Sequence, residues 1–243
     1  MASTLGPDLR QTRDMDTVTP FSRWTTPLIV DAAIRGGVRF TVVEPSLTAT
    51  IPGTRTCGPV RPVRHYGSVD VFLEAIDAAH RGDVLVIDNQ GRADEGCIGD
   101  LVAIEAQVAG IAGILCWGRH RDSGDIRQIG LPVFSLGTCP AGPRALRATT
   151  VDPVRLGSTA VTLDDFVFAD DDGIVIVPAA AAIGLLNGAR EIFEVERRQA
   201  EMVRSGRSLR EQFRFADYVA RRSADPGYTF RTHLRRIGGE IEE

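Results

Sequence analysis

Closely spaced pairs of cysteines or histidines are missing from this sequence of 243 residues. Its four cysteines, Cys57, Cys97, Cys116 and Cys139, form no C-x-x-C pair, and no two of its four histidines stand close together. Structural zinc sites are built from such pairs, so the spacing argues against one. The cysteines lie in or beside apolar runs, which indicates reduced thiols in a protein of the cytosol.

Signatures of nucleotide binding, hydrolysis and membrane insertion are also missing. The sequence has no P-loop and no G-x-S-x-G, and the glycines of 36–37 and 91–99 do not form G-x-G-x-x-G after a strand. The longest apolar run, 174–186, is too short to span a membrane and contains Pro178. Residues 1–8 show neither the basic nor the apolar region of a signal peptide. We therefore expect a soluble, cytoplasmic protein.

The composition suits a globular protein without a strongly basic surface. An apolar fraction of 43% is ample for a core, in one large domain or two small ones. The formal net charge of −4 argues against nucleic acid as a partner. Arginines do gather near the C-terminus, but acidic residues are interleaved, which favours a solvated or subunit-facing surface over a nucleic-acid patch. These arginines are Arg207, Arg210, Arg214, Arg221, Arg222, Arg231, Arg235 and Arg236.

Strands and helices alternate through the middle of the chain, which predicts a sheet covered by helices. The apolar stripe of the central helix is expected at Leu101, Ile104 and Val108. The predicted elements are a buried strand at 83–88, a helix at 100–108, a strand at 111–117, a short helix at 125–129 and a strand at 131–136.

Flanking segments complete the expected organisation. The prolines of 57–64 exclude a central strand there, so an edge strand is predicted, and Asp170–Gly173 predicts a hairpin tip. Helices are expected at 27–36, 69–80 and 180–205. The domains are predicted as an N-terminal arm at 1–24, one domain at 25–205, and a C-terminal extension at 206–243 that packs on a neighbouring subunit.

The start of the predicted helix 100–108 is the first candidate site. Asp100 follows Gly99, and a carboxylate at this position is routinely a helix cap favoured by the helix dipole. It can also belong to a binding site, because the N–H groups of Leu101 and Val102 lie in the first turn and are free to hold a carboxylate. Both interpretations stay open at this point.

Arg121 and Asp122 form the second candidate site. Twenty residues separate them from Asp100, and they follow the strand predicted at 111–117. A surface ion pair or a helix cap is the ordinary explanation. However, ligand sites of α/β sheets favour loops at the carboxyl ends of strands. Arg can hold a carboxylate through two hydrogen bonds and stabilise an enolate, and Asp offers hard oxygen ligands to Mg²⁺, directly or through water. With the helix start, the pair suits a metal ion and a small anionic substrate.

Other polar residues nearby have simpler interpretations. Asp125 is favoured as a first-turn helix charge over an acid that supports the site. His120 is either a base beside Arg121 or an exposed loop histidine. Asp170–Gly173 lacks the spacing and the distal Glu of an EF-hand, so a hairpin tip is favoured over a calcium loop.

Glu196 interrupts an apolar stripe on the predicted helix 180–205. The stripe runs through Leu185, Ala189 and Ile192 and continues past Glu196. A carboxylate on such a line is unusual. We expect it to reach solvent beyond the core, or to face a partner subunit or a site.

Six short segments recur in the order that is typical of one family, and the chain resembles the RraA-like / 4-hydroxy-4-methyl-2-oxoglutarate aldolase family over about 25–205. The specific part is the spacing of an Asp, twenty residues, and Arg-Asp. The segments are 52–59, 82–88, Gly99-Asp100-Leu101, 118–122, 131–143 and 169–178.

The resemblance implies a three-layer α/β/β sandwich of the swivelling phosphohistidine-domain type, assembled as a homotrimer or a hexamer. It implies a class II pyruvate aldolase that needs Mg²⁺ or Mn²⁺, with oxaloacetate decarboxylation as a side or main activity. By motif match, Asp122 holds the metal, mostly through water, and Arg121 binds pyruvate and its enolate. The backbone from Gly99 to Val102, chiefly the amides of Leu101 and Val102, takes the pyruvate carboxylate.

The acid/base network is also implied by the resemblance. Asp100 belongs to it, and a Glu near the C-terminus of an adjacent subunit completes it. Glu196 is the best match for that residue and Glu194 the second, while an N-terminal acid of the family falls near Asp31.

The chain departs from the family beside the site, where Trp117 replaces a frequent Asp, and Arg119 and His120 replace small or apolar residues. These changes bear on the substrate more than on the metal–pyruvate core. The main alternative is a non-catalytic RraA-like regulator that binds a ribonuclease. A methyltransferase using S-adenosylmethionine, a label that the family often carries, has no Gly-rich cofactor loop here to support it.

Overall fold

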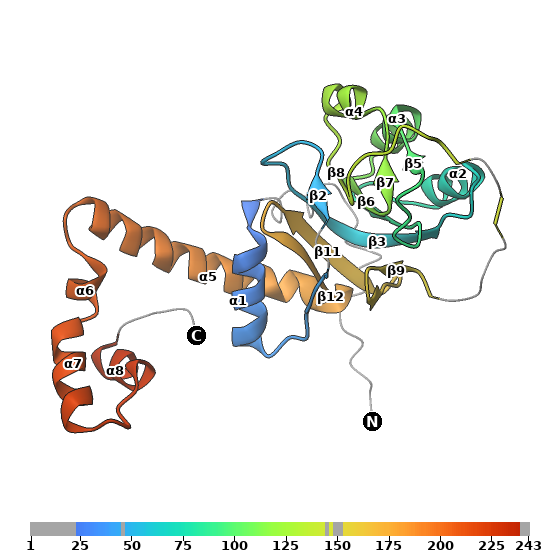
Figure 1. The fold of residues 1–243 in the computed structure, drawn as a ribbon. Coiled ribbons are helices and arrows are strands. Elements are labelled where there is room, and N and C mark those ends of the chain that lie inside the picture. The colour runs from blue at the N-terminus through green and yellow to red at the C-terminus, as the bar shows by residue number, and fades with distance from the viewer. Residues whose placement is uncertain (1–22, 45–46, 144–145, 148–152, 239–243) are drawn as a thin grey trace, which may run out of the picture. The chain divides into compact units, whose positions relative to one another are not determined.

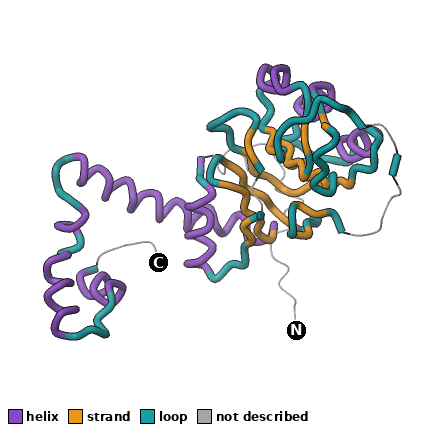
Figure 2. Tube along the Cα trace, viewed as in Figure 1, coloured by secondary structure: helices purple, strands orange, loops and turns teal. Residues whose placement is uncertain are grey.

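The computed structural model describes residues 23–44, 47–143, 146–147 and 153–238, so most of the predicted arm lies outside the described residues. The chain forms two compact units (Figure 1). Unit 1 comprises the described residues up to Pro27 together with Arg39–Ile183, and unit 2 comprises Leu28–Val38 together with the described residues from Gly184 onwards. The strands lie in unit 1, whereas unit 2 is helical (Figure 2).

The centre of unit 1 is an eight-stranded mixed sheet in the order β1-β12-β11-β3-β4-β6-β8-β2. Its middle strands are parallel, as the alternation of strands and helices predicts, and its flanks are antiparallel. The bounds are β1 (Thr41–Val42), β2 (Thr48–Ala49), β3 (Thr56–Arg64), β4 (Val84–Asp88), β6 (Gly113–Trp117), β8 (Val133–Ser135), β11 (Asp165–Asp170) and β12 (Gly173–Pro178).

Two small sheets and three helices complete unit 1. The strands β5 and β7 pair in parallel, and β9 and β10 pair antiparallel. The helices α2, α3 and α4 contribute to an apolar core on one face of the sheet, and a second core lies on the other face. The bounds are β5 (Gly96–Ile98), β7 (Arg119–His120), β9 (Arg155–Leu156), β10 (Thr159–Ala160), α2 (Asp70–Asp77), α3 (Asp100–Ala109) and α4 (Ser123–Ile129).

The strand β3 lies in the middle of the sheet, so the prediction of an edge strand for 57–64 is wrong. The reason is that β3 changes partners along its length. Residues 56–59 pair with β11 and residues 60–64 pair with β4. Each half of β3 therefore pairs with one strand only. A proline fits in such a half when its nitrogen, which carries no hydrogen, faces the unpaired side. The change of partner joins the antiparallel part of the sheet to the parallel part and curls it.

The helix α3 presents the opposite face to the one predicted. Leu101, Ile104 and Val108 are 75%, 43% and 74% exposed. The buried positions are Val102, Ala103 and Ala106, since small side chains let the helix lie close to the sheet. The predicted apolar stripe is therefore a surface feature in the single chain.

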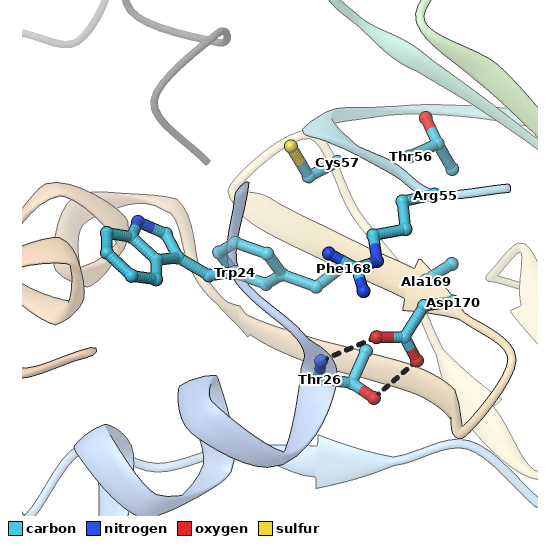
Figure 3. A pocket seen from close by; sticks show the side chains of 8 residues that line it. All are labelled: Trp24, Thr26, Arg55, Thr56, Cys57, Phe168, Ala169 and Asp170. Carbon is cyan, nitrogen blue, oxygen red and sulfur yellow. Dashed lines mark hydrogen bonds between the residues drawn. The ribbon is translucent and has the colours of Figure 1, made fainter. Parts of the chain in front are cut away.

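The hairpin at Asp170–Gly173 is confirmed, and its acidic residues have structural partners. The carboxylate of Asp170, at the end of β11, accepts hydrogen bonds from the Thr26 backbone N–H at 2.8 Å and from the Thr26 Oγ1 hydroxyl at 2.7 Å (Figure 3). Asp171 accepts a hydrogen bond from the Gly53 N–H. These bonds give the carboxylates of Asp170 and Asp171 structural partners.

Unit 2 consists of one long helix and four shorter ones. The predicted stripe of the long helix α5 is buried at Leu185, Ala189 and Ile192, and the absence of a side chain at Gly188 lets Ala32 approach. The C-terminal extension forms three short helices around a cluster of aromatic rings that encloses His233. The bounds are α1 (Thr26–Gly36), α5 (Ala179–Arg204), α6 (Leu209–Gln212), α7 (Phe215–Ala224) and α8 (Phe230–Ile237). No helix in the described part of the chain is long and apolar enough to cross a membrane.

Candidate functional site

The two candidate segments meet at Gly99. A Cβ atom added to Gly99 would lie 2.3 Å from Asp122 Oδ2 and 3.2 Å from Arg121 Nε. Only glycine allows this approach, because real Cβ atoms do not come so close to other heavy atoms. The start of α3 is therefore packed directly on the Arg121-Asp122 pair, as the spacing predicted.

A cavity of about 240 Å³ opens beside this contact. Three parts of unit 1 line it: the segment 65–69, the segment 96–102, and Arg121 with Pro143. Within the described residues, the N–H groups of Leu101 and Val102 have no acceptor, and the first helical bond of α3 is donated by Ala103 to the Gly99 carbonyl. Free N–H groups at a helix start favour an anion.

The side chain of Arg121 packs closely against two glycines. The backbone N–H of Arg121 donates to the Ile98 carbonyl at 2.9 Å, which joins it to the strand before α3. A Cβ at Gly142 would lie 2.7 Å from Arg121 Nη1, and one at Gly96 would lie 3.1 Å from Arg121 Cβ. The side chain keeps 46% of its surface exposed, so the guanidinium is held in place yet remains available to a ligand.

Asp122 has an unusual backbone conformation, with φ 56° and ψ 40° at the N-cap of α4. Non-glycine residues rarely adopt this region, although Asp tolerates it better than most. Its Oδ2 forms an ion pair with Arg121 Nε at 3.2 Å, and 35% of its side chain is exposed. Among the described residues no three His, Cys, Asp or Glu side chains cluster as a metal cage. Mg²⁺ needs none, because it is typically held by one or two carboxylates, water and substrate oxygens.

His120 is buried, so its interpretation as an exposed loop histidine is wrong. Its Nδ1 lies 2.7 Å from Ser135 Oγ and its Nε2 lies 2.9 Å from Ser123 Oγ. Ser123 directly follows Asp122, so the ring ties the turn at Asp122 to β8. With both ring nitrogens occupied, His120 is a support of the loop rather than a base facing the pocket.

Comparison with known protein families matches residues 26–176 to the RraA-like family, described as Aldolase/RraA. This match covers more than half of the chain. The chain belongs to the RraA-like family.

Individual members of the RraA-like family carry different names. A protein of Halalkalibacterium halodurans named "Putative 4-hydroxy-4-methyl-2-oxoglutarate aldolase" is 28% identical over 184 residues, which are 73% of this chain and 84% of that protein. Protein DlpA of Legionella pneumophila is 31% identical over 136 residues, 55% of this chain, and the match spans only 22% of its length. The crystal structure of Streptomyces coelicolor RraAS2, described as an unusual member of the RNase ES inhibitor RraA protein family, is 28% identical with a TM-score of 0.65. The match covers 76% of this chain and 95% of the RraAS2 chain.

Within this RraA-like chain, sequence reasoning missed one wall of the pocket, at His65. The histidine follows the carboxyl end of β3, a position that the same strand-end argument could have flagged. Its Nδ1 donates to Asn89 Oδ1 at 2.9 Å, and its ring stacks on Phe72. Arg147 donates one hydrogen bond to Glu95 Oε2 at 3.0 Å and one to Asn89 Oδ1 at 3.0 Å. It also forms an ion pair with Glu95 Oε1 at 2.9 Å.

The pKa of His65 lies below its ordinary 6.5, chiefly because burial disfavours the charged ring. Arg147 and Arg92 lower this pKa further, while the Asn89 hydrogen bond and Glu95 raise it. The unfolded chain therefore binds a proton at a higher pH than the folded chain does. The resulting stability is complete above pH 6.5 and is lost as the pH falls below it.

We predict that His65→Gln reduces the loss of unfolding free energy between about pH 7 and about pH 5.5, measured by urea titration. Part of the loss should remain, because burial also lowers the pKa of His120. His80→Gln is the matched control, since that side chain is 55% exposed. An unchanged pH dependence in His65→Gln would contradict the assignment.

Three further acidic residues that the family resemblance singles out lie in unit 2. Glu196 is half-buried on α5 and Glu194 is exposed, while Asp31 is half-buried on α1. Their roles stay predictions.

Proposed function

We propose that this chain is a divalent-metal-dependent lyase that cleaves a C–C bond in 2-oxo acids and releases pyruvate. The reaction is of the 4-hydroxy-4-methyl-2-oxoglutarate aldolase type, the oxaloacetate decarboxylase type, or both. The observation that carries the proposal is the contact of Gly99 with Arg121 and Asp122. It gathers free helix-start amides, a guanidinium and two carboxylates beside one pocket. The family match and the relative named as an aldolase support the same reaction class.

The absence of lysine favours the metal-dependent route to an enolate. All 28 basic residues of the chain are arginines. Aldolases that work without a metal form a Schiff base between a lysine amine and the substrate carbonyl. This chain has no lysine side chain to form one, so the electrons released by C–C cleavage must be stabilised electrostatically.

Each residue has a distinct task in the proposed reaction. The N–H groups of Leu101 and Val102 bind the pyruvate carboxylate, and Arg121 donates hydrogen bonds to the enolate oxygen as its charge develops. In retro-aldol cleavage, Asp100 accepts the proton of the substrate hydroxyl through water, with Glu196 in the same network. Decarboxylation of oxaloacetate produces the same enolate and has no hydroxyl proton to remove.

Asp122 and Asp100 suit Mg²⁺ or Mn²⁺, because carboxylates are hard oxygen ligands, the Asp122 side chain is 35% exposed and Asp100 lines the pocket. A bound cation would supply Lewis-acid polarisation of the 2-oxo group. The direct test is to screen 2-oxo acids with Mg²⁺ or Mn²⁺ for pyruvate release. We expect EDTA to abolish the activity and added cation to restore it; pyruvate release at full rate in EDTA would refute the metal assignment.

We predict that Asp100→Asn lowers aldolase activity more than oxaloacetate decarboxylation, because only the aldol cleavage needs a hydroxyl proton removed. The two rates are measured on the same preparation, so that an error in active enzyme concentration cancels. Equal losses would instead assign Asp100 to binding or structure.

We also propose a homotrimer or hexamer in which neighbouring chains share each site. The exposed Leu101, Ile104 and Val108 beside the pocket support this, since an apolar helix face is typical of an interface. The C-terminal extension is proposed to pack on a neighbouring subunit. For the curled sheet we propose the three-layer α/β/β arrangement of swivelling phosphohistidine domains.

Sharing predicts complementation. Asp122→Ala and Glu196→Ala proteins, each inactive alone, should regain part of the activity after subunit exchange, because some interfaces then hold both intact groups. A mixture of Asp122→Ala with Asp122→Asn is the control and should stay inactive. A catalytically active monomer by light scattering, or no rescue despite proven exchange, would refute the shared site.

A regulator that binds a ribonuclease is the second candidate. It is favoured by the 28% identity with RraAS2, a member of the RNase ES inhibitor RraA protein family. Inhibition of a ribonuclease that persists in Asp122→Ala, with no pyruvate released from any 2-oxo acid, would support the regulator over the enzyme.

A further inference from the structure

The proposed reaction does not use a pair of neighbouring thiols, one of which lines the pocket. Cys97 lies on β5 and Cys116 on β6, and their Sγ atoms are 3.2 Å apart. Cys97 borders the pocket, whereas Cys116 is completely enclosed. The other two cysteines, Cys57 and Cys139, are also free thiols.

The two thiols lie on two different strands. One strand leads to the start of α3, and the other leads to Arg121 and Asp122. The strand β5 ends at Ile98, Gly99 follows it, and α3 begins at Asp100. The strand β6 continues through Gly118 into β7, which precedes Arg121 and pairs with β5. A covalent bond between Cys97 and Cys116 would therefore act on the place where Gly99 meets Arg121 and Asp122.

We propose that Cys97 and Cys116 are a modification site that a peroxide converts into a reversible disulfide. A disulfide has an S–S length of about 2.05 Å, so the sulfurs need to approach by only about 1 Å. Small rotations of the side chains and a slight shift of β5 suffice, because β5 is a three-residue strand whose described ladder partner, β7, has only two residues.

Cys97 reacts first, since it is the thiol that borders the pocket. Its sulfur attacks one oxygen of the peroxide, the O–O bond breaks, and the released hydroxide takes the thiol proton as water, which leaves a sulfenic acid. The Cys116 sulfur then attacks the Cys97 sulfur, and the S–O bond breaks to release a second water. Two thiols lose two electrons, and one hydrogen peroxide becomes two waters.

Cys116 is suited to the second step rather than the first. The hydrogen bond with Cys97 and complete burial raise the pKa of the Cys116 thiol well above its ordinary value. It therefore does not react alone with an oxidant in solution. It needs a partner sulfur already in contact, and Cys97 is that partner.

Peptide mapping tests the bond without any assumption about the activity. The full chain is treated with hydrogen peroxide, its free thiols are alkylated after denaturation, and it is digested without reductant. Trypsin leaves both cysteines in one peptide, 93–119, because no other Arg or Lys lies between them. We expect this peptide two hydrogens lighter and unalkylated, and cleavage after Glu105 should leave halves that separate only after dithiothreitol.

Two variants complete the mapping. Cys139→Ser should form the same bond, and Cys116→Ser should leave a sulfenic acid on Cys97 that dimedone traps. Fully alkylated Cys97 and Cys116 in a sample whose Cys139 is oxidised would overturn the proposal, as would linkage of either thiol to Cys57 or to a second chain.

The fluorescence of Trp117 offers a second measurement of the bond, since Trp117 follows Cys116 directly. In a Trp24→Phe background it is the only tryptophan of the chain. Its fluorescence should change with peroxide, recover with dithiothreitol, and stay constant when Cys97→Ser is added. A peroxide response that persists with Cys97→Ser would overturn the assignment.

The effect of the bond on turnover rests on the proposed function, whereas the mapping does not. Because displacements of about 1 Å near reacting groups cost up to about 100-fold in rate, we expect the oxidised protein to lose at least about 10-fold in pyruvate release, reversibly. If the bond forms and pyruvate release is unchanged, the bond is not a switch. If no 2-oxo acid is cleaved in either state, the proposed function fails and the mapped bond still stands.

Discussion

Asp122→Ala should abolish pyruvate release, with a loss of at least about 1,000-fold, because Asp122 is the carboxylate proposed to hold the divalent cation. Neither fold nor assembly should change, since the side chain is partly exposed and its one described ion pair is with Arg121. The measurement is steady-state pyruvate release in excess Mg²⁺, together with circular dichroism and light scattering.

The backbone at Asp122 calls for a second variant. Alanine in the left-handed region costs about 1–2 kcal/mol, so Asp122→Ala alone would mix loss of the ligand with a shift of the turn. Asp122→Asn avoids this, because Asn tolerates that region and differs from Asp mainly in charge. We expect both variants to be inactive.

Asp125→Asn is the matched control. It makes the same chemical change three residues further along, in the first turn of α4, and should retain most of the activity. Near wild-type turnover of Asp122→Asn in excess Mg²⁺ would show that the metal assignment is wrong.

The contact between the two candidate segments could be predicted from the sequence because its signal is local. Asp100, Arg121 and Asp122 stand at element ends, and strand alternation with parallel pairing brings such ends to one sheet edge. The contact at Gly99 follows from the same topology. Most helices and strands of the central third were predicted for the same reason, since their apolar periodicity is strong over short ranges.

What the sequence did not predict depends on contacts between distant segments. The position of β3 in the sheet depends on its change of partner from β11 to β4, which no local pattern encodes. Which face of α3 points outward depends on how closely the helix approaches the sheet. The small side chains of Ala103 and Ala106 are buried there instead of larger apolar ones. His65 was missed and His120 was left between two interpretations, because His65 Nδ1 contacts Asn89, 24 residues away, and His120 Nδ1 contacts Ser135, 15 residues away.

Arg121→Lys should lower the catalytic efficiency of pyruvate release by at least about 100-fold, or about 2.7 kcal/mol of transition-state stabilisation. Lysine keeps the positive charge but loses the planar fork that can hold a carboxylate and an enolate oxygen together. The loss should be large because the guanidinium packs closely against glycine: Gly142 would have no room for a Cβ beside Arg121 Nη1. The lysine ammonium cannot place hydrogen-bond donors where the guanidinium does, so it leaves the charge of the enolate uncompensated.

The matched control is Arg119→Lys, two residues away, whose Nη1 donates to the Thr138 carbonyl. It makes the same substitution outside the proposed binding set and should have a much smaller effect. Oxalate, which resembles the pyruvate enolate, should inhibit the wild type competitively and bind Arg121→Lys far more weakly. Equal oxalate affinity in the two proteins would separate Arg121 from the enolate, and a crystal soaked with pyruvate and Mg²⁺ that placed the ligand away from Arg121 and the start of α3 would do the same.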